Sequence, residues 1–166
     1  MNRPHRIYLD TNIFIYALEE KSPRSDLLTQ LFAVHDVEQP FLVTSELALA
    51  ELLVRPYQTR NDGMVDAYDG LIRSSAWLEV RQVKRRTNIY AAILRAENRK
   101  IRLPDALHLA SAIEAECTYF MTADKGLGPE YRLDTVRDET TGEAARLDII
   151  RPDDSTLMRL LENHSR

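Results

Sequence analysis

Residues 7–12 read Ile7-Tyr8-Leu9-Asp10-Thr11-Asn12, a short apolar run of strand length that ends directly on an acid. Similar short apolar runs occur at 41–43, 77–80, 119–121 and 147–150. Longer stretches with helical spacing of apolar residues separate these runs, and such alternation favours a parallel sheet covered by helices. The sequence therefore predicts an α/β fold with five strands.

The helices are expected at 12–20, 25–37, 45–54, 62–74, 86–99 and 104–116, with a last one, capped by Asp153 or Ser155, reaching Asn163. Pro104 suits the first turn of its helix because its missing amide would be unpaired there, and this fixes Asp105 in the same turn. Between 128 and 145 the pattern weakens. A turn at 140–142 either joins a short hairpin or lies in a loop.

Composition limits the classes of protein to which the chain can belong. With 166 residues it is expected to form one domain over 1–166, and 44% hydrophobic against 29% charged residues excludes disorder. The net charge of −4 gives no overall attraction to nucleic acid or to a membrane surface. Cys117 alone cannot form an intramolecular disulfide, and no signal peptide or membrane anchor is apparent. We expect a soluble, cytoplasmic protein without a membrane partner.

Two acids directly follow predicted strands. Asp10 ends the first run, and Asp124 comes shortly after the run at 119–121. In an open parallel sheet, ligands bind outside the carboxyl ends of the strands, so these acids are candidates for a site. The structural alternative is a helix cap or a turn.

Two further acids lie on predicted helices. Glu51 shares a helix face with Leu47 and Val54, where a carboxylate is costly unless it is paired or binds a metal. The alternative is a buried Glu–Arg pair. Asp105 lies four residues before Leu109 and so borders an apolar face, although an acid in a first helical turn can serve the helix dipole alone.

Convergence of these acids would require compensating positive charge. At about 5 Å and an effective dielectric near 20, each pair of like charges costs about 3 kcal/mol. Bound cations or raised pKa values are therefore needed. Oxygen ligands without a cysteine partner select Mg²⁺ or Mn²⁺ over zinc.

The segments YLDTN, TSELALAELLVRP, LPDALHLASA and FMTADKGL resemble, in order and spacing, the acidic motifs of PIN-domain ribonucleases, especially VapC-type toxins of type II toxin–antitoxin systems. The resemblance covers about residues 6–128. It implies a three-layer α/β/α sandwich around a central, mainly parallel five-stranded sheet. Residues 129–166 lie beyond it and are expected to form a C-terminal strand or hairpin and a helix.

The resemblance also implies an activity, which is metal-dependent endonucleolytic hydrolysis of RNA by a toxin that blocks translation. The family's four acidic positions fall on Asp10, Glu51, Asp105 and Asp124, which are thereby implied to be catalytic and to hold one or two Mg²⁺ or Mn²⁺ ions, some of them through water. A small cognate antitoxin and a homodimer are the implied partners. The target RNA is not readable from the sequence, because specificity resides in surface loops and RNA shape.

Polar neighbours of the acids have two interpretations. Thr11 is expected to cap the helix after the first strand, while Asn12 and Thr122 either hydrogen-bond a metal-bound water or phosphate or serve in caps and turns. His108 lies three residues after Asp105. We interpret it as a packed histidine hydrogen-bonded to that neighbour rather than as a proton shuttle or a ligand.

Positive charge is concentrated between residues 81 and 102, where eight basic residues face Glu97 alone, a local excess of seven. Arg95, Arg99 and Arg102 have i, i+4, i+7 spacing and would follow RNA phosphates along one helix face beside Asp105. Arg85 and Arg86 are further candidates for RNA binding. The alternative is a solvated face, or pairing with neighbouring acids.

Two other functions remain open on these residues. A haloacid-dehalogenase-like phosphatase also uses an aspartate after its first strand, but its chemistry prefers a second acid two residues later, where this chain has Asn12. A non-catalytic, metal-dependent binding or receiver-like module would bind the ion and leave RNA intact.

Overall fold

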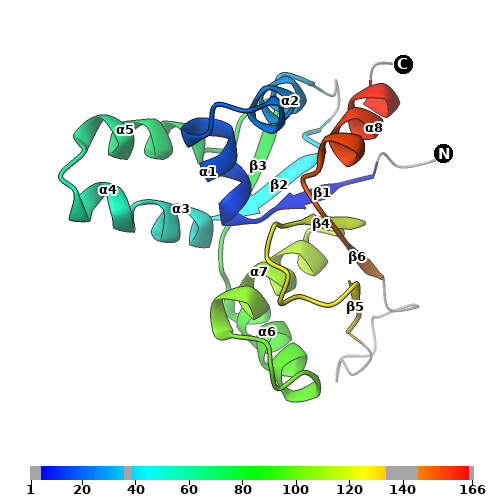
Figure 1. Ribbon diagram of the computed structural model, residues 1–166. Helices are drawn as coiled ribbons and strands as arrows, with labels where there is room; N and C mark the ends of the chain where they lie inside the picture. The colour runs from blue at the N-terminus through cyan, green and yellow to red at the C-terminus, as the bar shows by residue number, and fades with distance from the viewer. Residues whose placement is uncertain (1–4, 36–38, 134–145, 165–166) are drawn as a thin grey trace.

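The computed structural model describes residues 5–35, 39–133 and 146–164. Six strands form one sheet in the order β3-β2-β1-β4-β6-β5 (Figure 1). Their bounds are β1 Ile7–Leu9, β2 Leu42–Ser45, β3 Leu78–Arg81, β4 Tyr119–Met121, β5 Glu130–Tyr131 and β6 Leu147–Ile150. All neighbours pair in parallel except β5, which runs antiparallel to β6. The α/β class and mainly parallel sheet are confirmed, but the count of five strands is wrong because β5 is too short to leave an apolar run.

Eight helices connect or flank the described strands. They are α1 Thr11–Glu19, α2 Pro23–Phe32, α3 Glu46–Leu52, α4 Val54–Gln58, α5 Asp62–Leu71, α6 Arg85–Glu97, α7 Leu103–Glu114 and α8 Asp154–His164. The helix predicted over 45–54 is shorter and is followed by α4, because Pro56 lacks the amide that would continue the ladder to Leu52. The helix predicted over 25–37 ends at Phe32. The predicted turn at 140–142 lies outside the described residues.

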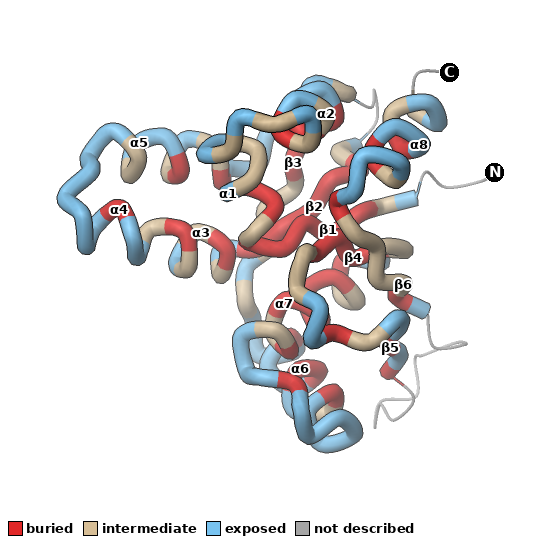
Figure 2. Tube along the Cα trace, in the orientation of Figure 1, coloured by how far each residue is buried: buried red, intermediate tan, exposed pale blue. Residues whose placement is uncertain are grey.

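The core lies in two layers on opposite faces of the sheet. On β1, Ile7 and Leu9 pack with the apolar side chains of α1, α2, α3, α5 and α8, whereas Tyr8 packs with those of α6 and α7. This alternation follows from the two-residue period of a strand. Figure 2 shows the buried sheet between the two helical layers. The three-layer α/β/α arrangement is thereby confirmed.

Local sequence signals set where the helices near the sheet's carboxyl edge begin. Pro104 stands in the first turn of α7, so Asp105 lies in that turn as predicted. Asp153 caps α8 by accepting a hydrogen bond from the Thr156 amide at 2.9 Å. In the part of the chain that the structure describes, no helix is both long and apolar enough to cross a membrane.

Candidate active site

Asp10 follows β1 and is the N-cap of α1, where its Oδ1 accepts a hydrogen bond from the Thr11 amide at 2.8 Å. Its Oδ2 accepts from Thr122 Oγ1 at 2.6 Å and from Asn12 Nδ2 at 3.2 Å. The residue is only 8% exposed. Three donors therefore fix the carboxylate in one orientation at the carboxyl end of the central strand.

The three predicted supporting residues all contact the acids. Asn12 and Thr122 lie 3.2 Å apart through Asn12 Nδ2 and Thr122 Oγ1, and both donate to Asp10. Asn12 Oδ1 also accepts from the Ala123 amide, which ties α1 to the loop after β4. The expectation that Thr11 caps α1 is wrong, because Asp10 takes that role and the Thr11 hydroxyl donates to Glu51 at 2.6 Å.

Glu51 lies on α3, and its side chain is 34% exposed. Its Oε2 accepts from Thr11 Oγ1 and lies 3.4 Å from His108 Nε2, so the predicted alternative of a buried Glu–Arg pair is wrong. Burial raises the pKa of Glu51, but the hydrogen bonds from His108 and Thr11, with the charges of His108 and Arg102, outweigh burial and hold the pKa below its ordinary value. Glu51 therefore carries a negative charge at neutral pH.

Asp105 and Asp124 share one cation. Arg102 Nε donates to Asp105 Oδ2 at 3.0 Å, and Arg102 Nη2 lies 3.7 Å from Asp124 Oδ2. Burial raises the pKa of Asp105, and the charges of Asp124 and Asp10 raise it further, despite the opposing contribution of Arg102. Acids from three separate segments thus act on one another electrostatically, and Glu51 is linked to them through the charge of Arg102.

The four carboxylates are oxygen donors, the type of ligand that suits Mg²⁺ or Mn²⁺. Within the described residues, no three His, Cys, Asp or Glu side chains form a group already arranged to hold a metal ion. All four acids nevertheless offer oxygen, and Mg²⁺ takes only one or two carboxylates directly. The guanidinium of Arg102 between two of the acids shows that this place attracts positive charge.

Arg102→Gln removes that resident positive charge. We expect Mn²⁺ to bind the variant about 2–5-fold more tightly, because Asp105 and Asp124 lose the cation that competes for them. This change in affinity corresponds to the free energy of a typical exposed ion pair. Titration followed by the electron paramagnetic resonance of free Mn²⁺ measures the change. Arg99→Gln, which removes the same charge three residues away, is the control, and equal effects of the two variants would contradict direct competition.

Gly126 leaves room for Asp124. A Cβ on this glycine would lie 3.1 Å from Asp124 Oδ1, the atom that accepts a hydrogen bond from the Gly126 amide at 2.8 Å. We expect Gly126→Ala to displace the carboxylate and to weaken Mn²⁺ binding by about 2–10-fold, with little change in thermal stability, because the carboxylate is at the end of a flexible side chain. The control is Gly70→Ala, in which the new Cβ meets nothing within 4 Å. Unchanged Mn²⁺ binding in both variants would contradict the role of Asp124.

The predicted RNA-binding arginines do not lie on one helix face. The helix α6 ends at Glu97 because Asn98 leaves the helical conformation, so Arg99 falls in the turn and Arg102 becomes the N-cap of α7. Arg95 Nε lies 3.4 Å from the Ile101 carbonyl, and Arg86 donates to the Tyr90 hydroxyl. The five arginines proposed for RNA binding, Arg85, Arg86, Arg95, Arg99 and Arg102, are all exposed.

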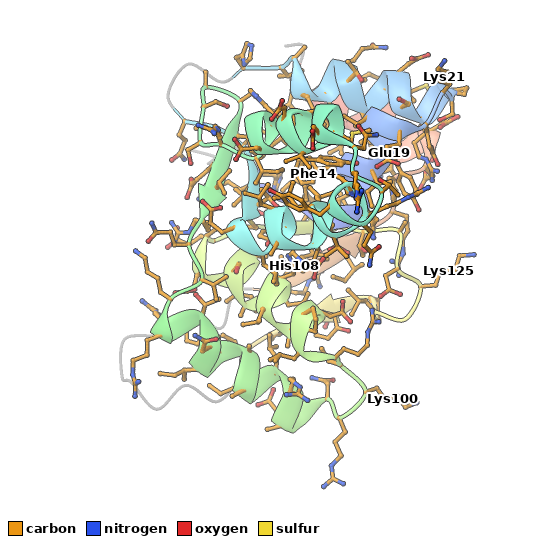
Figure 3. The ribbon with its side chains drawn as sticks, turned by 90° about the vertical axis from the view of Figure 1, so that its left-hand side faces the viewer. Phe14, Glu19, Lys21, Lys100, His108 and Lys125 are labelled. Atoms are coloured by element: carbon orange, nitrogen blue, oxygen red, sulfur yellow. The ribbon has the colours of Figure 1, made fainter. Side chains whose placement is uncertain are left out.

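His108 is buried, and its contacts differ from the prediction. Its ring lies against Tyr8, Thr11 and Glu51 rather than Asp105. Its Nε2 is also 3.8 Å from Asp10 Oδ1. In Figure 3, His108 lies between α3 and α7, whereas Lys100 and Lys125 extend outward.

Sequence reasoning missed two polar residues behind the acids, Tyr8 and Ser45. Both are fully buried, and their hydroxyls lie 2.8 Å apart. A tyrosine within an apolar strand and a serine before a helix carry no signal that distinguishes them from core and cap residues. Only the pairing of β1 with β2 brings them together.

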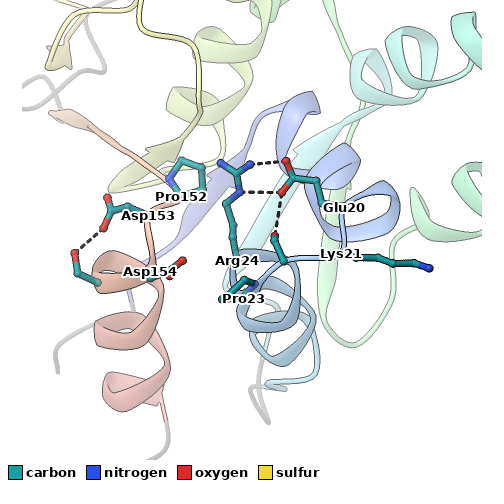
Figure 4. A pocket seen from close by; sticks show the side chains of 9 residues that line it. Glu20, Lys21, Pro23, Arg24, Pro152, Asp153 and Asp154 are labelled. Carbon is teal, nitrogen blue, oxygen red and sulfur yellow. Dashed lines mark hydrogen bonds and ion pairs between the residues drawn. The ribbon is translucent and has the colours of Figure 1, made fainter.

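A depression lies away from these acids, between the start of α2 and the start of α8 (Figure 4). None of the four predicted acids lines it. Arg24 is held there by two hydrogen bonds to Glu20, and Ser155 donates to Asp153. Arg24 and Glu20 thus satisfy one another, and the four acids remain the better candidate site.

The structure is therefore an α/β domain with a mainly parallel sheet and a group of carboxylates at its carboxyl edge, two of which pair with Arg102. The chain belongs to the PIN-domain family, because the family model for the PIN domain matches residues 7–128. This match includes all four segments that suggested the family. A comparison with curated protein sequences gave no match.

Solved structures show the same fold at low sequence identity. VapBC2 from Rickettsia felis, bound to a promoter DNA fragment, is 22% identical with a TM-score of 0.54, covering 71% of this chain and 88% of that one. Mycobacterium tuberculosis VapC20, described as a toxin that cleaves the sarcin–ricin loop, is 20% identical with a TM-score of 0.52, covering 69% and 86%. DNA-bound VapBC from Salmonella typhimurium is 16% identical with a TM-score of 0.54, covering 90% and 99%. The chain thus has a PIN fold similar to that of VapC toxins.

Proposed function

We propose that this protein is a metal-dependent endoribonuclease that hydrolyses RNA phosphodiester bonds. The observation that carries the proposal is the sharing of one cation, Arg102, by Asp105 and Asp124, in a PIN domain whose Asp10 and Glu51 act on the same site. Such a group of carboxylates is unfavourable without added positive charge, and a divalent cation supplies it.

Asp10, Glu51, Asp105 and Asp124 would hold Mg²⁺ or Mn²⁺, in part through water. When bound, the cation polarises the scissile phosphate and lowers the pKa of a water for in-line attack. Asn12 and Thr122 hold the Asp10 carboxylate in place before substrate arrives. This preorganisation favours catalysis because no reorientation is needed during the reaction.

The proposed substrate is RNA, bound by local rather than overall positive charge. Arg85, Arg86, Arg95, Arg99 and Arg102 are exposed, and Arg102 contacts the acids themselves. Phosphate contacts by exposed arginines position a nucleic acid without reading its sequence. We therefore expect binding to RNA to weaken as salt rises.

The proposal is tested by incubating purified protein with total bacterial RNA and Mn²⁺ or Mg²⁺, with EDTA as the control. We expect discrete fragments that require the metal. Intact RNA in the presence of folded, metal-loaded protein would contradict nuclease activity toward the RNAs in that pool. It would favour the alternative of a metal-dependent binding module.

We further propose that the protein is the cytoplasmic toxin of a toxin–antitoxin pair, forms a homodimer and is restrained by a small antitoxin. A similar solved structure, from Klebsiella pneumoniae, is a toxin–antitoxin complex, with 18% identity, a TM-score of 0.52 and coverage of 71% of this chain and 86% of that one. Exposed apolar side chains on α1 and α4, Ile15, Leu18, Val54 and Tyr57, offer surface for a partner. Expression from the native locus should recover a small bound protein, and repeated purification without one would contradict this assignment.

A further inference from the structure

Three buried polar side chains form a continuous chain behind the acids. The Tyr8 hydroxyl lies 2.8 Å from Ser45 Oγ and 2.8 Å from His108 Nδ1. The opposite ring nitrogen, His108 Nε2, lies 3.4 Å from Glu51 Oε2 and 3.3 Å from Thr11 Oγ1. Ser45 and Tyr8 are fully buried and His108 is 1% exposed. The chain therefore runs from the end of β2 through β1 and α7 to a carboxylate at the surface.

The hydrogen-bonding partners of His108 decide which of its ring nitrogens carries a hydrogen. The Glu51 carboxylate only accepts hydrogen bonds, so a favourable contact with it requires a hydrogen on His108 Nε2. Tyr8 and Ser45 can each reverse the direction in which their hydroxyls donate. The chain consequently satisfies a neutral or a charged imidazole, and both forms present an N–H group to Glu51.

The surroundings of these hydrogen-bonded side chains are apolar. Burying them there lowers the stability of the fold unless each of them has a hydrogen-bond partner. Tyr8 stacks on Phe120 at a ring-centroid distance of 5.2 Å, and both belong to the core between the sheet and α6–α7. Buried polar groups in such a core are destabilising when a partner is lost. In this chain each link has a partner, and the last link is Glu51.

Glu51 needs such support because it stands half-buried on a helix of only seven residues. Its two side-chain partners, Thr11 and His108, both contact Oε2. Within the described residues, no hydrogen bond engages Oε1. One carboxylate oxygen is therefore fixed, and the other stays available to a cation or to its water.

We propose that Ser45, Tyr8 and His108 form a buried positioning chain that aims Glu51 at the cation. His108 is a positioning residue in this arrangement, neither a ligand nor a catalytic residue. The inference rests on the proposed function, since it assigns these side chains a task in metal binding. It explains why a histidine, two hydroxyls and a glutamate from four segments are joined by hydrogen bonds.

The test compares three replacements of His108 by their Mn²⁺ affinity, measured from the resonance of free Mn²⁺. A glutamine amide nitrogen reaches the position of Nε2 and keeps the contact with Glu51, whereas an asparagine amide reaches that of Nδ1 and keeps only the contact with Tyr8. We expect His108→Gln to bind Mn²⁺ about 3–10-fold more weakly than the wild type, because it keeps the contact with Glu51 but loses the one that joins His108 to Tyr8. His108→Asn and His108→Leu should bind about 10–100-fold more weakly, as is typical when groups that orient a ligand are lost.

A double-mutant cycle separates positioning from a general structural role. If His108 acts through Glu51, the double variant His108→Leu/Glu51→Gln binds Mn²⁺ no more weakly than Glu51→Gln alone. If His108 only stabilises the core, the two losses multiply. Thermal melting of every variant identifies those folded at the assay temperature, and His108→Gln with His108→Asn keep the comparison possible if His108→Leu fails to fold.

The outcomes distinguish this inference from the function on which it rests. Wild-type protein that binds Mn²⁺, with folded His108→Asn and His108→Leu binding it equally well, would overturn the positioning chain alone. Multiplying losses in the cycle would do the same. Folded wild-type protein that binds no Mn²⁺ would overturn the proposed function and this inference with it.

Discussion

Replacing Asp10 with asparagine is expected to reduce metal-dependent RNA cleavage by at least about 100-fold, since even losing groups that merely orient a ligand costs 10–100-fold. Asp10 lies at the end of the central strand, where three donors hold its carboxylate. Asparagine has nearly the same shape but lacks the charge that attracts a cation. The rate of fragment formation at saturating Mn²⁺ measures the loss.

The matched control is Asp66→Asn, which removes an exposed carboxylate from α5. It should cleave RNA at the wild-type rate. We expect Asp10→Asn to remain folded, because asparagine can still accept the bond from the Thr11 amide. Wild-type cleavage by folded Asp10→Asn would remove Asp10 from the active site.

Phe120→Ala is expected to destabilise the protein by about 3–5 kcal/mol, as is typical of a buried phenylalanine. The ring is fully buried at the centre of β4 and stacks on Tyr8 with an interplanar angle of 8°. A domain of this size has a total stability of about 5–15 kcal/mol. The variant should therefore be partly unfolded at modest urea concentrations.

Urea denaturation measures this loss, and the reactivity of Cys117 reports it independently. Burial raises the pKa of the Cys117 thiol to about 12, so the thiol stays protonated and unreactive until the core opens. Met158→Ala, at a side chain that is 49% exposed on α8, should cost less than about 0.5 kcal/mol. Equal losses in the two variants would contradict the assignment of Phe120 to the core.

The parts of the fold that the sequence predicts well are those with strong local signals. The apolar runs at 7–9, 119–121 and 147–150 became strands with the predicted bounds. The strand β5 was missed because two residues leave no periodic pattern. The end of α2 was misplaced because the apolar pattern continues past Phe32 although the helix does not.

The site shows the same division between local and tertiary information. The positions of Asp10 after a strand and Asp105 in a first helical turn follow from neighbouring residues, and the structure has them there. The Arg102–Asp105 pair is local, but the contact of Arg102 with Asp124 and that of His108 with Glu51 depend on how separate segments pack. Such contacts between segments up to 57 residues apart leave no trace in local spacing.

The most direct test of the central claim is the chemistry of the RNA ends produced by the purified protein. Water attacking the phosphorus with departure of the 3′-oxygen, aided by a divalent cation, leaves a 5′-phosphate and a 3′-hydroxyl. We predict these ends on every discrete fragment, with none formed in EDTA or by Asp10→Asn. Fragments ending in 2′,3′-cyclic phosphate, or cleavage that persists in EDTA, would contradict a metal-dependent hydrolase.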